Sequence, residues 1–571
     1  MSAPPLPFTT AGINVELIRN LSYKDLLNYC KTHPAIKHIC DTDPNILNLK
    51  LQKYVQYIME KNDNDINKTF FYSIKKNDIT VLNYLLNVMN FDPSIDDNEG
   101  LMLACEASNY AIVNILLRHT NVDPLAREGT ALLICVEHGN LNILDLFLNK
   151  VNLPSELLSE LFIHACENDK VSIVSRLLEY KELYEDINIL NDGLTICCDH
   201  GFTDIFDILI NIPEIEPSDE CLESAISNGH LEIFHKLILD KRVQITDNMF
   251  ITACSSGQYE MAKELLKFDI DPTAEDQLAL HYAVENGHIE IVKMLLDLPE
   301  IDPSADDQNV LNIACQKGYY EIVEMLLKDD RIDPTFDDCI SLQLASKYGY
   351  KNIVELFIND GRIDSTICYN KAFEYALKSK KYEIADILVP YVDKETLNEG
   401  IKLTCKSGNY ETTELLLSHG ADPSVDNNIC IIYACKNNNE KIVLLLLKDS
   451  RVDPTVDEYL PLVIAIKNNN YNIVNTLISD NRIKVIPMFI IENVITIGNL
   501  DIFDLLLKKI KITADILNRA VVYGNYLIVN RLLEYKFTKN EINEAISLAK
   551  ENSDILLLLY DYLNKNFPAH K

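Results

Sequence analysis

The fold is decided by a stretch that the chain repeats almost in register. Residues 301–331 read IDPSADDQNVLNIACQKGYYEIVEMLLKDDR, and residues 332–362 read IDPTFDDCISLQLASKYGYKNIVELFINDGR. A third copy begins at Ile363. Repetition at a fixed period of this length is the signature of a repeat architecture, so the period overrides any division of the chain by its length alone.

Each copy predicts two antiparallel helices. In the first copy Leu311, Ala314 and Cys315 recur with the spacing of one helix face. Gly318 follows them, and glycine enters the left-handed conformation that ends a helix at the lowest steric cost. A second apolar face follows, and Pro334 stops the helix that carries it. One such pair cannot bury its apolar face alone, so the pairs are expected to stack into a solenoid.

The repeat extends over most of the chain, because sixteen copies align on the small residue of the first helix at intervals of mostly 28 to 31 residues. The aligned positions are Ser73, Ala104, Cys135, Ala165, Cys197, Ala225, Ala253, Ala283, Ala314, Ala345, Ala376, Thr404, Ala434, Ala465, Val494 and Ala520. We therefore predict an all-α solenoid of about 16 helix-turn-helix units over residues 66–571. Its last segment, ILLLLYDYLNK, is expected to form a C-terminal capping helix.

Composition bounds the function. Fifty-two Lys and Arg against 86 Asp and Glu give a formal charge of −34, which disfavours nucleic acid and anionic membranes as partners. The amino terminus lacks a basic region followed by an apolar stretch, and no apolar run is long enough to cross a bilayer. Fifteen cysteines without a Cys-x-x-Cys motif favour free thiols in a reducing compartment. We expect a cytoplasmic monomer that has no cofactor.

The repeat units resemble ankyrin repeats. The copy at 278–296, LALHYAVENGHIEIVKMLL, shows the family pattern in Leu280-His281, Gly287 and the apolar residues that follow. The resemblance implies a non-catalytic scaffold that binds a protein partner on its concave face, and it implies that His281 caps backbone groups. The usual Gly-x-Thr-Pro before Leu-His is absent and the period is near 31, so we expect tight turns in place of extended β-fingers.

The amino-terminal residues do not fit the repeat. Residues 1–11 contain three prolines and are predicted to be disordered, and residues 12–65 form a helical module in which Ser22 is a candidate N-cap. This module resembles the later portion of an F-box, although the leading Leu-Pro-x-Glu and the final Trp are missing. The resemblance implies docking on the adaptor subunit of a cullin-type ubiquitin ligase through Leu21, Asp25, Leu26, Leu27 and Cys30. The alternative is a plain helical cap on the first repeat.

Acidic residues fall at one place in successive units. They include Asp96, Asp97, Asp276, Asp306, Asp307, Asp337, Asp338, Asp426 and Asp457. Stacking would align them along one edge, either as a solvated edge of turn residues or as a negative strip that attracts a basic partner. Their spacing lacks the ligand pattern of an EF-hand loop, so calcium is disfavoured.

Other candidate sites have structural explanations. Cys30, His33, His38 and Cys40 could bind zinc, but their spacing fits no zinc knuckle, and buried cysteine is favoured. Six cysteines follow the small residue of the first helix and are predicted to be core, namely Cys105, Cys166, Cys254, Cys315, Cys405 and Cys435. No nucleophile, base and acid assemble, and no phosphate-binding loop is present. A metal protein or an unrecognised enzyme is therefore the less favoured alternative.

Two functions of a scaffold stay open at this stage. The chain could be a substrate receptor, in which residues 12–65 dock on the ligase and the array holds the protein to be modified. It could instead mask or anchor its partner without any link to ubiquitin. An F-box-like amino terminus followed by many ankyrin copies is similar to proteins of large DNA viruses that infect amoebae, and this architecture implies the host cell cytoplasm.

Overall fold

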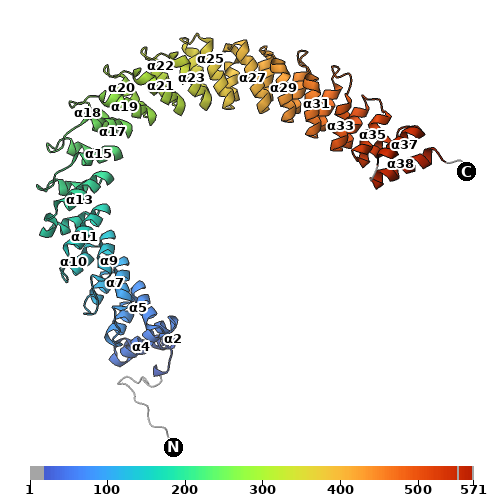
Figure 1. Ribbon diagram of the computed structural model, residues 1–571. Coiled ribbons are helices and arrows are strands. Elements are labelled where there is room, and N and C mark those ends of the chain that lie inside the picture. The colour runs from blue at the N-terminus through green and yellow to red at the C-terminus, as the bar shows by residue number, and fades with distance from the viewer. Residues whose placement is uncertain (1–17, 550–551, 569–571) are drawn as a thin grey trace, which may run out of the picture. The chain divides into compact units, whose positions relative to one another are not determined.

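The computed structural model describes residues 18–549 and 552–568 of the chain. The predicted disordered tail and the first residues of the helical module lie outside the described residues. The described part contains α-helices and two short 3-10 helices, and it contains no strand. Contacts divide the chain into two units, Met1–Pro272 and Thr273–Lys571. The predicted all-α repeat architecture is confirmed within each unit (Figure 1).

The first unit begins with three helices that precede the repeats, α2 (Tyr23–Lys31), α3 (Pro34–Thr42) and α4 (Pro44–Lys61). Its helix pairs are α5 (Ile66–Lys75) with α6 (Ile79–Asn87), α7 (Ile95–Glu106) with α8 (Tyr110–Leu116), α9 (Ala126–Glu137) with α10 (Leu141–Leu148), α11 (Ser155–Glu167) with α12 (Val171–Leu177), α13 (Ile187–His200) with α14 (Thr203–Ile210), α15 (Asp219–Asn228) with α16 (Leu231–Leu237), and α17 (Asp247–Ser255) with α18 (Tyr259–Leu265). The 3-10 helix η1 (Lys181–Tyr184) lies between α12 and α13.

The second unit consists of pairs throughout. They are α19 (Ala274–Glu285) with α20 (Ile289–Leu296), α21 (Ala305–Lys317) with α22 (Tyr320–Leu327), α23 (Phe336–Tyr348) with α24 (Lys351–Asp360), α25 (Thr366–Lys378) with α26 (Tyr382–Leu388), α27 (Lys394–Ser407) with α28 (Tyr410–Ser418), α29 (Val425–Lys436) with α30 (Glu440–Leu447), α31 (Val456–Lys467) with α32 (Tyr471–Ser479), α33 (Met488–Ile497) with α34 (Leu500–Leu507), α35 (Ala514–Val522) with α36 (Tyr526–Leu532), and α37 (Lys539–Leu548) with α38 (Ser553–Asn566). The 3-10 helix η2 (Val389–Tyr391) follows α26.

The described residues hold seventeen pairs, one more than the sixteen aligned copies, because α37 and the predicted terminal helix α38 also pack as a pair. We call the first helix of each pair the inner helix and the second the outer helix. Inner helices pack on inner helices and outer on outer, as α21 does on α23 and α22 on α24. Leu311 and Ile322 are at most 1 % exposed in this packing. Each such aliphatic side chain contributes about 1.5–3 kcal/mol on burial, so stacking stabilises a pair that is too small alone.

The predicted helix-ending glycines have positive φ wherever the inner helix ends on one of them. Gly318 follows α21 with φ of 84°, and its amide hydrogen bonds to the carbonyl of Ala314 at 2.9 Å. Asn77, Asn438 and Asn469 have φ between 54° and 56° at the same place in other units. The prediction from residue type is therefore confirmed, because this position selects for tolerance of the left-handed region.

The turn before several inner helices is a run of three residues with positive φ, which the sequence did not predict. In α21 these residues are Asp306, Asp307 and Gln308, with φ between 48° and 57°. Equivalent triplets lie in α7, α9, α19, α23, α29 and α31. Asp and Asn tolerate this region better than most residues, which explains the acidic turn composition. The expected tight turns are confirmed, and their conformation is left-handed.

In several triplets the side chain of the third residue forms a hydrogen bond to the next unit. The side-chain oxygen of Gln308 accepts a hydrogen bond from the backbone N–H of Asp333 at 2.6 Å, and Gln277 does the same for Asp302 at 2.7 Å. Asn98 accepts from the N–H of Asp123, and Asn428 accepts from that of Asp453. These hydrogen bonds give a backbone donor of one unit an acceptor in the preceding unit, and so they join the two units.

An arginine clasp joins the outer ends of successive units. Arg331 pairs with Asp329 at 2.7 Å and donates from Nη1 to the carbonyl of Ile301 in the preceding unit at 2.6 Å. The same arrangement of arginine, aspartate two residues earlier and a carbonyl about 30 residues earlier recurs at Arg242, Arg362, Arg451 and Arg482. These guanidinium groups are occupied by the fold and do not offset the exposed acidic charge.

Two pairs of cysteines correct the expectation that all the thiols are free. Cys30 on α2 is bonded to Cys40 on α3, and Cys339 on α23 is bonded to Cys368 on α25. Neither pairing was visible in the sequence, because helix packing alone brings the partners together. The predicted core cysteines Cys105, Cys166, Cys254, Cys315, Cys405 and Cys435 are free and buried, as expected.

Candidate interaction surface

The acidic residues predicted to form an edge are all exposed, and all lie in the left-handed triplets. In the first unit these are Asp96 and Asp97, and in the second unit Asp276, Asp306, Asp307, Asp337, Asp338, Asp426 and Asp457. Units that begin at α25 and α27 have no triplet, because α25 follows Ser365 directly and Asp393 caps α27. The edge is therefore interrupted between Asp338 and Asp426.

Part of the acidic edge is neutralised by basic residues from neighbouring units. Arg127 lies 3.4 Å from Asp97, Lys371 pairs with Asp338, and Lys402 pairs with Asp426. These cations come from the next unit or from the preceding one. Charge pairs at exposed positions contribute little to stability, but they cancel the local field that a charged partner would meet.

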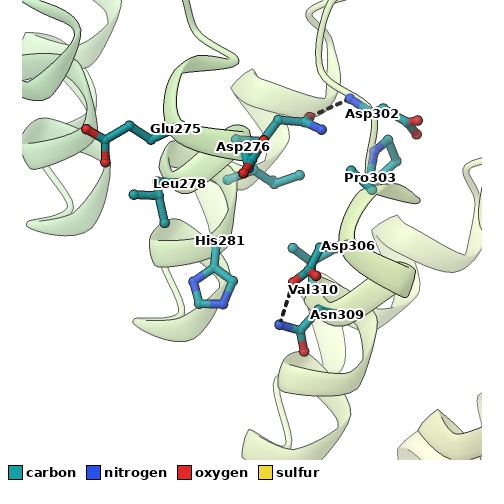
Figure 2. A pocket seen from close by; sticks show the side chains of 12 residues that line it. Glu275, Asp276, Leu278, His281, Asp302, Pro303, Asp306, Asn309 and Val310 are labelled. Carbon is teal, nitrogen blue, oxygen red and sulfur yellow. Dashed lines mark hydrogen bonds between the residues drawn. The ribbon is translucent and has the colours of Figure 1, made fainter.

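Asp96, Asp337 and Asp457 have no ion pair among the described residues, and four further turn carboxylates without one lie in two consecutive units. Within residues 18–549 and 552–568, no Lys or Arg forms an ion pair with Glu275, Asp276, Asp306 or Asp307. A pocket of about 580 Å³ lies between the triplets that carry them. Figure 2 shows its two walls, with Asp276 and His281 on α19 facing Asp306, Asn309 and Val310 on α21. We call Glu275, Asp276, Asp306 and Asp307 the open acidic edge.

The walls of this pocket are fixed by hydrogen bonds between and within the units. Gln277 accepts from the N–H of Asp302 at 2.7 Å, and Asn309 donates to Asp306 at 3.1 Å (Figure 2). The carboxylate of Asp302 accepts from the hydroxyl of Ser304 at 2.7 Å, and this bond lowers the pKa of Asp302. Leu278, Leu280 and Val310 add apolar lining, so the pocket combines a charged rim with an apolar wall.

His281 lines the same pocket without the backbone contact that was expected of it. Its Nδ1 is buried and has no hydrogen-bond partner among the described residues. The family pattern places Thr three residues before the histidine, and this chain has the apolar Leu278 there. The histidine therefore does not cap backbone groups in this structure.

The predicted adaptor-docking residues divide between core and surface. Leu26 and Cys30 are 0 % and 5 % exposed, and they pack with Ile18, Cys40 and Ile46 in a small core of the module. Leu21 and Leu27 are half-buried. Asp25 is exposed, and its side chain and backbone both bond to Ser22, the predicted N-cap. The module therefore has a core of its own, and only part of the predicted set can reach a partner.

The candidate zinc ligands of the module do not form a cluster. Cys30 and Cys40 are bonded to each other, so neither has a thiolate to offer a metal. Within the described residues, no group of three or more His, Cys, Asp or Glu side chains has an arrangement that would hold a metal ion. No described helix is both long enough and apolar enough to cross a bilayer.

Comparison with protein families gives one match, repeated along the chain. A model described as ankyrin repeats (3 copies) matches residues 70–157, 222–307, 250–338, 311–398 and 401–486. These ranges together cover more than half of the chain, and they include the open acidic edge. No curated protein matches the sequence.

Similar solved structures include the pentatricopeptide repeat protein PPR10 in complex with an 18-nt psaJ RNA element. Identity to it is 12 % with a TM-score of 0.29, and the alignment covers 95 % of this chain and 89 % of that chain. PPR10 from maize is similar at 12 % identity and a TM-score of 0.25, covering 96 % and 93 % of the two chains. The charge-based prediction of no nucleic-acid partner conflicts with an RNA-bound repeat protein, and we withdraw it. A likeness at this TM-score supplies no argument for what this chain binds.

Proposed function

Because the chain belongs to the ankyrin-repeat family and is a repeat-type protein-interaction scaffold, we propose that its open acidic edge binds a basic segment of a protein partner. The observation that carries this proposal is the set of four carboxylates at Glu275, Asp276, Asp306 and Asp307, which have no ion pair among the described residues. Unpaired charge around an apolar-lined pocket raises the association rate of an oppositely charged partner and fixes its register.

The contrast with the rest of the edge supports this assignment. Asp338 and Asp426 have the same conformation as Asp306, but each is paired with a lysine. Asp96, Asp337 and Asp457 also have no ion pair among the described residues, so what distinguishes the open acidic edge is the pocket that Glu275, Asp276 and Asp306 line. Leu278 is half-buried in the wall of the pocket and offers apolar contact area for the side chains of the same segment.

The test is peptide binding to the full chain with two matched variants. The probe is a fluorescein-labelled helical peptide with lysines on one face and leucines on the other. D276N/D306N removes two charges and keeps residues that tolerate positive φ. E290Q/E321Q removes two exposed charges from the outer helices of the same two units. We expect only D276N/D306N to slow association and to weaken its salt dependence. Equal effects of both variants, or none, would sink the proposal.

A finer proposal is that the chain is a substrate receptor of a cullin-type ubiquitin ligase, acting in a host cell cytoplasm. The observation that favours it is the separate core of α2, α3 and α4, in which α4 packs against the first repeat. A masking or anchoring scaffold is the alternative, in which the module serves only as a cap. In the receptor proposal Leu21, Asp25 and Leu27 contact the adaptor, because Leu26 and Cys30 are buried.

The two alternatives differ in one binding measurement. Purified adaptor subunit is titrated against the full chain and against Leu27→Asp, a change at a half-buried position outside the module core. Binding that Leu27→Asp abolishes, with an unchanged thermal unfolding curve, supports the receptor. Absence of binding by the unaltered chain removes the receptor proposal and leaves the masking or anchoring scaffold.

A further inference from the structure

The amino-terminal module differs in charge from the rest of the chain. Residues 18–61 contain seven Lys and Arg against four Asp and Glu, whereas the whole chain has a formal charge of −34. Of the seven cations only Lys50 forms an ion pair, with Asp41 at 3.1 Å, as far as the described residues show. The arginine clasps of the repeats are satisfied internally, so this module carries exposed positive charge that the fold does not use.

Two of these cations lie over a cluster of tyrosine rings. Tyr23 at the start of α2 packs against Tyr54 and Tyr57 of α4, with ring centroids 5.0 Å and 5.7 Å apart. Lys61 lies 4.7 Å from the centroid of Tyr57, and Lys24 lies 5.7 Å from it. Lys24 and Lys61 are exposed, and the side chains of Tyr23 and Tyr57 are half-buried. We call Tyr23, Lys24, Tyr57 and Lys61 the basic aromatic face.

The face is held rigidly by the packing beneath it. Tyr54 donates a hydrogen bond to Asp78 of the first repeat, which anchors the ring cluster between the module and the array. Lys61 hydrogen-bonds to the hydroxyl of Tyr57 one turn earlier on α4 and lowers the pKa of that tyrosine. Ordered tyrosines flanked by cations lose little side-chain entropy on binding and are typical of the energetic centre of a protein interface.

We propose that the basic aromatic face is a second docking site, which takes an acidic helical segment of a protein. The two exposed ammonium groups pair with its carboxylates, and the half-buried rings of Tyr23 and Tyr57 contact its apolar side chains. With the open acidic edge in the second unit, the chain then presents docking sites of opposite charge to two different proteins. This inference goes beyond the proposed function, since it holds whichever protein the repeats bind.

Single-stranded nucleic acid is the competing anionic ligand, and the geometry disfavours it at this face. Binding of single strands relies on aromatic rings whose faces are free to stack on bases. Here the rings pack on one another, and Tyr23 lies between Tyr54 and Tyr57. The carboxylate of Asp78 beside Tyr54 also repels a phosphate backbone, whose charge density exceeds that of an acidic helix.

The experiment titrates two fluorescein-labelled probes against the full chain at low salt. One probe is a helical peptide with glutamates on one face and leucines on the other, and the second is an oligouridine of equal formal charge. The test variant is K24Q/K61Q. The matched control is K31Q/K37Q, which removes two exposed lysines of the same module that make no ion pair among the described residues.

We expect the peptide to bind, K24Q/K61Q to raise its Kd about fivefold or more, and K31Q/K37Q to change it little, because the charge contacts are local. Equal changes in both variants would overturn the proposal, as would no peptide binding. Tighter binding of the oligouridine that K24Q/K61Q abolishes would overturn it in favour of nucleic acid. Failure here leaves the open acidic edge untouched, since that test uses a probe of the opposite charge.

Discussion

Gln308 and Asp333 belong to consecutive units, and the side-chain oxygen of the first accepts the backbone N–H of the second at 2.6 Å. Gln308 is 6 % exposed although it is polar, because its amide is part of the joint between the units. One unit later the equivalent residue is Cys339, which is bonded covalently to Cys368 of the following unit. The same turn position thus joins neighbouring units by a hydrogen bond or by a disulfide.

Replacing Gln308 by Leu should destabilise the second unit by about 0.5–1.5 kcal/mol, because the N–H of Asp333 loses its hydrogen-bond acceptor. The measurement is urea unfolding followed by circular dichroism. Q316L is the control, since Gln316 is exposed on the same helix. A midpoint that moves equally in both variants would contradict the role assigned to this hydrogen bond.

Removing the covalent joint should also lower stability. Cys339 and Cys368 close a loop with a sequence separation of 29 residues. Constraint of an unfolded loop of this length contributes about 3–4 kcal/mol. We expect C368A to lose roughly that amount under oxidising conditions, and we expect reductant to destabilise C368A less than the unaltered chain, because only Cys30–Cys40 remains to be reduced. C315A removes a buried thiol that is free, and it should respond to reductant as the unaltered chain does.

The arginine clasps predict how stability depends on pH. Hydrogen bonds from the neighbouring arginine lower the pKa of Asp240, Asp329, Asp360, Asp449 and Asp480. A carboxyl whose pKa is lower in the folded chain stabilises the fold above its unfolded pKa of about 4, and this contribution is lost as pH falls through the folded pKa. The free energy of unfolding should therefore decrease below about pH 4.

Denaturation across a pH series checks this expectation, and R482Q tests its cause. Arg482 pairs with Asp480 and donates to the carbonyls of Val452 and Leu447 at 2.6 and 2.7 Å. Without the guanidinium, the pKa of Asp480 should return toward its ordinary value. The free energy of unfolding should then decrease less steeply as the pH falls below about 4. If the free energy of unfolding of R482Q depends on pH as that of the unaltered chain does, other carboxylates determine the acid sensitivity.

Alanine substitutions at two glycines distinguish the cost of backbone strain from the cost of a steric clash with a neighbouring side chain. Gly287 has φ of 78°, and a Cβ added there would lie 2.9 Å from Cζ of Tyr319 in the next unit. Gly420 has φ of 91° and nothing within 4 Å of such an atom. Alanine at either position pays about 1 kcal/mol for the left-handed conformation. G287A should lose about 1–3 kcal/mol more than G420A in chemical denaturation, because Tyr319 must also move. If both variants lose the same free energy of unfolding, Tyr319 moves aside at no measurable cost.

The parts of the candidate site that the sequence could reveal were those set by residue type. The acidic turns were visible because Asp recurs at one place in several copies, and the structure places each predicted aspartate at the surface. The sequence did not show which of these carboxylates form ion pairs with lysine or arginine. Asp338 and Asp307 are equivalent in sequence, yet only Asp338 meets a lysine, which lies 33 residues further along the chain. The basic aromatic face was missed for the same reason, since Tyr23 and Tyr57 are on different helices.

Local rules, by contrast, were sufficient for the repeat itself. The helix pair and the helix-ending glycines depend on residues within a few positions of one another, and the period repeats them along the chain. Helical periodicity and tolerance of positive φ are properties of short segments, so the sequence by itself determined the ankyrin architecture. Only the tertiary structure decided which carboxylates are open, which cysteines are bonded and which tyrosines gather beneath lysines. Those outcomes depend on groups in different helices, which packing alone brings within contact distance.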